Sequence, residues 1–376
     1  MRLFGRKAAA GGGRPALMRS MLGIATQGEW PRSYEAQIRE AYIGNAVAQR
    51  AVRMVAEGCA GVPFYAAEDD HPAEPLLRAT SAGQGLIETV AAQLLLHGNA
   101  YVQIVCDALG EPAELYALRP ERVSIEPDAR GWPAAYVYKA GENVTRLPLE
   151  DGLGRPALVH IRTMHPLDDH YGLGCLGAAA GAVSIHNAAT RWNKALLDNA
   201  ARPSGALVYD PGEAGAALSG EQFERLKAEM EASFAGSANA GRPMLLEGGL
   251  KWQAMSMTPA DMDFVGLKAA AAREIALAFG VPPMLLGLPG DNTYANYSEA
   301  NRALWRLTIL PLADKILGAV AQGLKAWWPE LSLALDLDQV PALAADRERL
   351  WSQVSAADFL SEGEKRVMLG FSENKP

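Results

Sequence analysis

Cysteine is scarce in this chain of 376 residues, and its three cysteines, Cys59, Cys106 and Cys175, lie far apart. Their odd number and wide spacing exclude a disulfide framework and a paired-cysteine zinc site, and they are typical of a reducing cytoplasm. The amino terminus begins with basic residues but lacks the continuous apolar segment of a secretory signal, so we expect none.

The common catalytic motifs are also missing. The sequence has no phosphate-binding P-loop, no G-x-S-x-G nucleophile elbow and no Cys/His pair in a persuasive setting. We therefore expect a protein that is not an enzyme and needs no cofactor. At 49% hydrophobic and 21% charged residues, the chain has ample material for a core and is long enough for two or more domains.

Charge is absent from residues 171–190, a stretch long enough to be considered as a membrane span. Its content argues against that interpretation, because only four residues are large aliphatics and four others are polar. We expect a helix with a small-residue face and no membrane partner.

Acidic residues outnumber basic ones outside the first 28 residues. That tail has five basic residues and no acid, and it includes a run of three glycines from Gly11. The tail thus carries +5 and the remainder −13, which together give the net −8 of the chain. Since nonspecific DNA affinity comes from Lys and Arg that displace counterions, the acidic body is a poor phosphate clamp. We interpret the tail as a flexible leader, with contact to nucleic acid or a neighbouring subunit as the alternative.

The pattern along the first half predicts a mixed α/β domain. Helices are expected at 34–57 and 85–96, with a strand at 62–66 between them. A β meander follows, its strands separated by Gly, Pro, Asp and Asn turns. We place these strands at 101–106, 114–118, 123–126, 135–139 and 157–161.

Two long helices are expected to enclose a smaller module. The first spans about 174–199 and the second about 259–279, which begins with Thr258-Pro259 and ends before Gly280. Between them we expect a helix at 221–234 and strands at 206–209, 244–246 and 252–255. This arrangement is typical of a helical stalk with a small α/β tip.

A loop rich in Gly, Asn and Tyr follows the second long helix, and Asn296 is expected to open a further helix. Pro311 lies inside that helix and should kink it, because the ring removes one backbone hydrogen bond and crowds the preceding turn. Leucines that alternate from Leu331 to Leu337 predict a half-buried strand returning to the first domain, with Asp336 and Asp338 on its outer face. Short helices are expected to end the chain.

Several segments, in this order, resemble the phage portal proteins of long-tailed phages and gene transfer agents. They include AYIGNAVAQRAVRMVAEGCAGVPFY, LLLHGNAYVQIV, HYGLGCLGAAAGAV, NAARPSGALVY, FGVPPMLLG, TYANYSEANRALWRLTILPLADKI and FLSEGEKRVMLGF. The resemblance covers roughly residues 35–371, and its specificity lies in the succession of segments. It implies an α+β portal fold. The implied parts are a tail (1–30), wing (31–173), stem helix (174–199), clip (200–257), stem helix (258–280), tunnel loop (281–297), wing again (298–345) and a short crown (346–376).

The resemblance also implies a function. It predicts a dodecamer in a virion or phage-like particle, assembled in a bacterial cytoplasm, that passes double-stranded DNA through a capsid vertex. Terminase and then head–tail connector proteins would dock on the clip, and capsid or scaffold protein would contact the wing. The tunnel loop carries the predicted DNA-facing residues Asn292, Thr293, Tyr294, Asn296 and Tyr297 and has no Lys or Arg. Such a loop would let a polyanion slide without gripping it.

The main alternative is a nucleotide-dependent or metal-dependent α/β enzyme. The segment from Gly172 to Gly177 reads G-x-G-x-x-G, a dinucleotide-binding pattern. However, the preceding strand ends about ten residues too early for that fold. The other interpretation is that Gly177 and Gly181 allow close helix packing. A metal site would use the cluster of His160, His165, Asp168, Asp169 and His170, although it lacks histidines at helical spacing.

Overall fold

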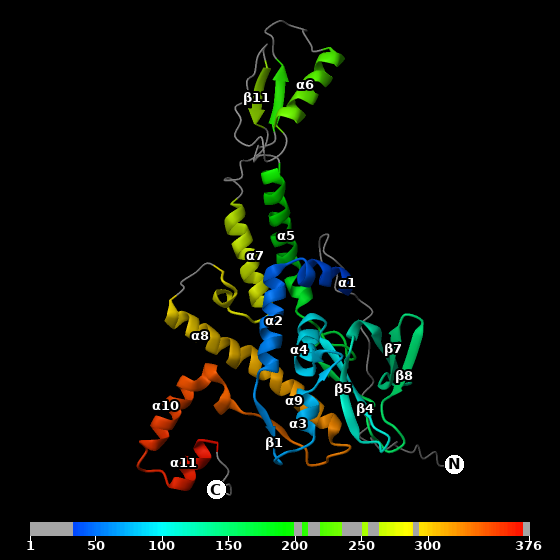
Figure 1. Cartoon of the computed structure of the whole chain (residues 1–376), viewed down its shortest axis with the longest axis vertical. Coiled ribbons are helices and arrows are strands. Elements are labelled where there is room, and N and C mark those ends of the chain that lie inside the picture. The colour runs from blue at the N-terminus through cyan, green and yellow to red at the C-terminus, as the bar shows by residue number, and fades with distance from the viewer. Residues whose placement is uncertain are drawn as a thin grey trace, which may run out of the picture.

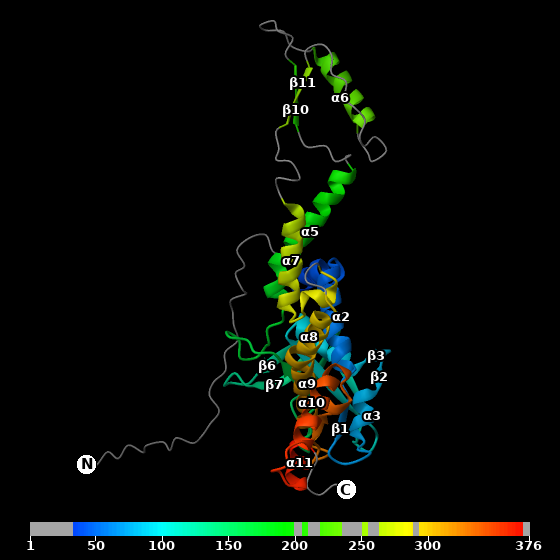
Figure 2. The same cartoon turned by 90° about the vertical axis from the view of Figure 1, so that its left-hand side faces the viewer.

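The computed structural model describes residues 33–198, 205–209, 219–234, 250–254, 263–288 and 293–370. The molecule is elongated, with a broad mixed domain at one end, a pair of helices rising from it, and a small α/β module beyond their ends (Figure 1). Figure 2 shows the same order from the side and places the two stem helices beside each other.

The first helical region is divided at Gly44-Asn45, where a single helix was predicted. α1 (Tyr34–Gln37) continues into the π-helical η1 (Ile38–Ile43), and α2 (Ala46–Ala60) then begins. The Oδ1 atom of Asn45 accepts hydrogen bonds from the backbone nitrogens of Val47 and Ala48 at 3.1 and 3.0 Å. Asn45 is therefore an N-cap, because its side chain satisfies amides that have no partner inside the helix.

The strands form two three-stranded sheets rather than one meander. One has the order β5-β4-β9, and the other β6-β7-β8, all antiparallel. The five predicted strands are confirmed, whereas β8 was missed because its side chains are mostly exposed. The bounds are β4 (Asn99–Cys106), β5 (Pro112–Leu118), β6 (Val123–Pro127), β7 (Pro133–Ala140), β8 (Asn143–Pro148) and β9 (Leu158–Arg162).

Smaller elements complete this end of the wing. β1 (Phe64–Ala66) pairs with β12 (Leu333–Leu335), so the predicted return of the late strand to the first domain is confirmed. α4 (Leu86–Leu96) packs on α2 and buries Val90, Ala91 and Leu94. The other short elements are α3 (Ala73–Arg78), β2 (Thr80–Ser81), β3 (Gln84–Gly85) and η2 (Pro120–Arg122).

α5 (Leu176–Asp198) and α7 (Phe264–Ala278) pack against each other and lie in the two segments predicted as stem helices. The rings of Trp192 and Phe264 stack with their centroids 5.8 Å apart. Ala271 and Ala272 of α7 are buried within this one chain. Asp263, expected inside the second helix, is instead its N-cap with φ 38°, and the predicted start at Thr258 lies outside the described residues.

Beyond the stem lie β10 (Gly205–Tyr209), α6 (Gly220–Phe234) and β11 (Leu250–Ala254) (Figure 1). β10 and β11 are antiparallel, with Gly205 opposite Ala254. The predicted helix and two of the predicted strands are thus confirmed, and the strand predicted at 244–246 lies outside the described residues.

A long helical run crosses the wing from the base of the stem. It comprises α8 (Tyr294–Leu304), the π-helical η5 (Trp305–Ile309) and α9 (Leu310–Leu324). α9 is a core helix, because it buries Ile316, Leu317, Val320 and Leu324. This run passes a length-and-composition test for a membrane span, which the core helices of soluble proteins also pass.

The carboxyl-terminal part contains η6 (Leu337–Gln339), η7 (Pro341–Leu343), α10 (Ala344–Ser355) and α11 (Glu362–Met368). The predicted strand ends at Leu335, so Asp336 and Asp338 do not form its outer face. Asp336 accepts the backbone N–H of Asp338, and Asp338 is ion-paired with Arg347. The predicted short helices are confirmed, and α11 starts with a capping box of Ser361 and Glu364.

Candidate functional site

The segment that follows α7 is anchored at its start. After α7, Gly280 adopts φ 66°, and its carbonyl accepts a 2.7 Å hydrogen bond from the Thr308 hydroxyl on η5. The short helix η4 (Pro283–Leu286) follows and ends at Gly287, which has φ 72°. Both glycines adopt positive φ, a backbone conformation that residues with a side chain disfavour. The chain therefore turns back towards η5 at a defined point.

The structure places most of the predicted tunnel-loop residues on a helix. α8 begins at Tyr294, and Thr293 is its N-cap, with the Thr293 hydroxyl accepting from the backbone N–H of Asn296 at 3.2 Å. The prediction that Asn296 opens this helix was therefore wrong by two residues. Asn292 lies outside the described residues.

Tyr294, Asn296 and Tyr297 lie together on the first turn of α8. All three are exposed, and Tyr294 is 90% exposed. Large aromatic side chains left in solvent commonly mark contact surfaces. The helix therefore presents neutral aromatic and amide groups outward.

The two arginines of α8 and η5 are already engaged in ion pairs. Arg302 is largely buried and contacts both Glu299, at 3.0 Å, and Asp346 on α10, at 3.5 Å. Arg306 lies 3.9 Å from the same Asp346 carboxylate. Residues 281–301 contain no Lys or Arg. The surface therefore offers little unpaired positive charge to a phosphate backbone.

Pro311 lies next to the change in helical hydrogen bonding. The π-helical η5 ends at Ile309, and Pro311 is in the first turn of α9. Proline donates no backbone hydrogen bond and crowds the preceding turn, which the wider π segment accommodates. The helical run thus changes from π-helical to α-helical hydrogen bonding just before Pro311, and the kink at Pro311 stays a prediction.

At the glycine motif, residues 172–177, the backbone crosses the turn at Gly98 in close contact. Gly172 and Gly174 pack against the turn at Gly98, which has φ 81°. A Cβ atom on Gly172 would lie 2.0 Å from the Gly98 carbonyl oxygen, and one on Gly174 would lie 2.5 Å from the Leu96 carbonyl oxygen. These glycines are needed for contact between two backbones, which removes the main support for a dinucleotide site. Gly177 has open space around its Cβ position, so it makes no close helix contact within this chain.

Asn99 holds this crossing together, and the sequence pattern did not identify its role. Its side chain is buried, and its Oδ1 accepts the backbone N–H of Gly172 at 2.7 Å. Its Nδ2 donates to the Gly172 carbonyl at 3.1 Å. The Nε2 atom of His160 lies 3.0 Å from Asn99 Oδ1, so His160 carries its proton there and donates. The signal available in the sequence was the H-G-N turn before a strand.

The histidines predicted as possible metal ligands are separated into different roles. The His160 ring stacks on Tyr101, with the centroids 4.3 Å apart. Burial, with Arg162 nearby, lowers the pKa of His160 to about 3. His165 accepts the backbone N–H of Leu167, and His170 Nε2 lies 2.5 Å from the Gly131 carbonyl oxygen. No group of three or more His, Cys, Asp or Glu side chains converges within the described residues.

Comparison with known proteins gives a consistent result. A Rickettsia felis protein is 41% identical over 345 residues, which is 88% of each chain. A chain from the virion of a native gene transfer agent (GTA) particle is 50% identical, with a TM-score of 0.71 and coverage of 91% of this chain and 94% of that one. A chain from the neck of a native GTA particle, computed with C12 symmetry, is 49% identical with a TM-score of 0.71, covering 93% and 97%.

The family comparison covers the elements from α2 to α11 together. Residues 46–370 match the sequence model of the family described as phage portal protein. That match extends over α8 and the glycine crossing alike. The chain belongs to the phage portal protein family.

Proposed function

We propose that twelve copies of this chain close into a ring at one vertex of a phage-like capsid and form the channel for double-stranded DNA. The observation that carries this proposal is the similarity, at 49% identity over 93% of the chain, to a subunit of a GTA neck with C12 symmetry. Portal proteins have a structural role, so we assign no catalytic step to this chain.

Negative-stain microscopy and native mass spectrometry test the ring directly. We expect rings with an axial hole and a mass of about 480 kDa, twelve times the 40.1 kDa of one chain. Purified particles that contain the chain only as isolated copies would contradict the proposal.

We propose further that the first turn of α8 faces the channel. Two features support this: exposed Tyr294 and Tyr297 with neutral chemistry, and pairing of Arg302 and Arg306 with Asp346. A channel wall that bound phosphates tightly would create deep energy minima along the path of the DNA. Neutral side chains would guide the duplex while leaving it free to slide.

Weak DNA binding by the channel wall can be tested by adding positive charge to α8. We expect the wild-type ring to bind duplex DNA weakly at physiological salt, with a dissociation constant above 1 µM. Tyr294→Lys with Asn296→Lys should tighten binding about tenfold or more and steepen its salt dependence, measured by fluorescence anisotropy. The matched control places two lysines at the exposed neutral residues Asn143 and Thr145 on β8, far along the wing. A submicromolar dissociation constant of the wild-type ring for duplex DNA would contradict a channel that binds DNA only weakly.

Pro311 gives a second prediction about the same helix. Pro311→Ala restores a backbone donor, so the π-helical segment should shorten towards regular α-helix and rotate α8 relative to α9. We expect DNA packaging to fall about tenfold or more while the ring still assembles. Packaging is measured as nuclease-protected DNA per particle, and Pro341→Ala, in η7, is the control. Normal DNA packaging by assembled Pro311→Ala rings would show that Pro311 does not set a geometry of α8 that packaging needs.

The partners are proposed from the same architecture. A terminase motor and later a head–tail adaptor would dock on the module formed by β10, α6 and β11, since it projects from the stem (Figure 1). Scaffold or capsid protein would contact the wing. Pull-down with a chain lacking residues 205–254 should lose the terminase and adaptor while keeping the capsid contact.

A further inference from the structure

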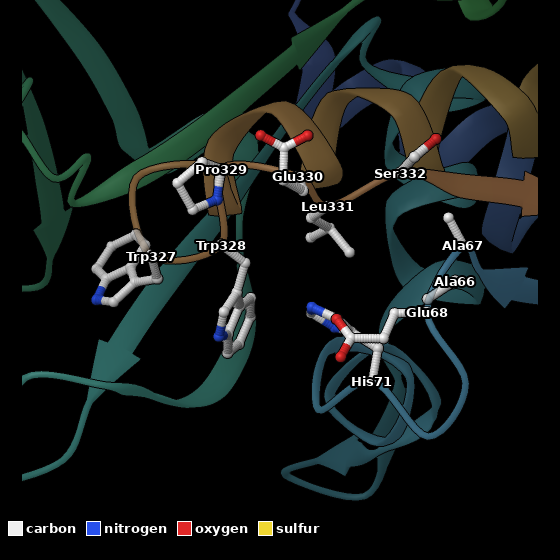
Figure 3. A pocket seen from close by; sticks show the side chains of 10 residues that line it. All are labelled: Ala66, Ala67, Glu68, His71, Trp327, Trp328, Pro329, Glu330, Leu331 and Ser332. Carbon is white, nitrogen blue, oxygen red and sulfur yellow. The ribbon is translucent and has the colours of Figure 1, made fainter.

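A pocket of about 410 Å³ lies at the end of the wing away from the stem. It is formed between the segment that follows β1 and the segment that follows α9. In Figure 3 the side chains of Trp328 and Leu331 point towards His71 across the opening. The His71 and Trp328 rings meet edge to face with centroids 5.1 Å apart, and His71 Nδ1 accepts the backbone N–H of Ala73. The pocket floor is thus aromatic, apolar and held in place.

Carboxylates lie on two sides of this floor. Glu68 extends over His71, and Glu330 lies on the opposite rim with its carboxylate directed outward (Figure 3). Both side chains are exposed, and neither has a hydrogen bond or ion pair to another described residue. No Lys or Arg lines the pocket. The site therefore fits an apolar side chain flanked by positive charges.

We propose that this pocket docks the amino-terminal segment of its own chain, residues 2–7. That segment reads Arg-Leu-Phe-Gly-Arg-Lys, two apolar residues between cations. Phe4 meets Trp328 and Leu331, while Arg2 on one side and Arg6 or Lys7 on the other pair with Glu68 and Glu330. The tail that contains it carries +5 with no acid, and the rest of the chain carries −13, so the charges are complementary.

The chain is long enough for this contact. The helices α1, η1 and α2 contain 4, 6 and 15 residues, and together they span at most about 40 Å. The linking residues 44–45 and 61–66 add at most about 30 Å. The pocket thus lies within about 70 Å of Ser33, whereas the chain from Lys7 to Ser33 reaches about 85 Å when extended. Docking here would keep the most basic segment of the protein away from the DNA path.

Photo-crosslinking in the full-length chain tests the proposal. Phe4 is replaced by the photoreactive amino acid benzoylphenylalanine, and the cross-linked peptides are identified by mass spectrometry. We expect cross-links to peptides that contain residues 66–71 or 327–332. Because each partly exposed ion pair contributes modestly, Glu68→Gln with Glu330→Gln should lower the cross-link yield about fivefold.

The matched control is Glu142→Gln with Glu221→Gln, which removes the same charge from the β7–β8 turn and from α6. It should leave the yield unchanged. Mixing isotope-labelled with unlabelled chains before assembly identifies the copy that supplies the segment. Cross-links to DNA, to other surfaces or only between labelled and unlabelled chains would overturn the proposal. A yield that falls equally in the control would overturn it as well.

Discussion

Gly172→Ala is expected to destabilise the folded chain by about 3 kcal/mol or more and to lower its melting temperature by about 5 °C or more. The new methyl group would lie 2.0 Å from the Gly98 carbonyl oxygen and 2.8 Å from the backbone of Thr163. These neighbours are backbone atoms, so no side-chain rotation can relieve the overlap. Differential scanning fluorimetry and urea unfolding measure the effect.

Gly177→Ala is the matched control within the same motif. Its Cβ would meet no atom within 4 Å, and alanine loses less backbone entropy than glycine on helix formation. We expect unchanged or slightly raised stability. Equal damage from both substitutions would refute the backbone-crossing interpretation. If Gly177 packs against a neighbouring subunit, its substitution should reduce ring yield while leaving the stability of the isolated chain intact.

Acid is expected to weaken the fold through His160. In the folded chain its pKa is lowered to about 3, chiefly by burial, while an unfolded chain binds this proton near pH 6.5. The unfolded state thus binds more protons as the pH falls between these values, so stability is complete above pH 6.5 and declines towards pH 3. We expect a loss on the order of 3 kcal/mol from this residue. Protonation would also oppose Arg162 and disturb the ring stacked on Tyr101.

The variant His160→Gln distinguishes the effect of protonating His160 from the effect of losing its hydrogen bond to Asn99. Glutamine keeps an N–H donor for Asn99 but takes up no proton, so its urea midpoint should fall less than that of the wild type between pH 7 and pH 4. His165→Gln, on the following loop, should retain the wild-type pH dependence. An unaltered acid response in His160→Gln would show that another group controls it.

Most helices and strands could be predicted from local pattern, because alternating apolar residues and Gly, Pro or Asp turns mark them. The failures have physical reasons. Asn45 was read as an interior helix residue although Gly44-Asn45 is a strong cap signal, and Thr293 was passed over in favour of Asn296. The exposed strand β8 has little apolar alternation to reveal it.

Contacts between segments that lie far apart in the sequence could not be predicted from local sequence pattern. The meeting of Gly98 with Gly172 depends on how β4 and the start of α5 are brought together, and Asn99 joins them across 73 residues. The sequence showed the absence of cations at 281–301 but not that Arg302 and Arg306 share one carboxylate. The pairing of these two arginines depends on Asp346 of α10, which local sequence pattern does not bring beside α8.

That shared carboxylate has a mechanical consequence. Asp346 is the first-turn acid of α10, and through it two arginines couple this helix to the shaft formed by α8 and η5. If the first turn of α8 faces the channel as we propose, a displacement of this turn by DNA would be carried through these ion pairs to α10. The carboxyl-terminal helix α10 would then respond to DNA in the channel, although it lies outside the proposed channel wall.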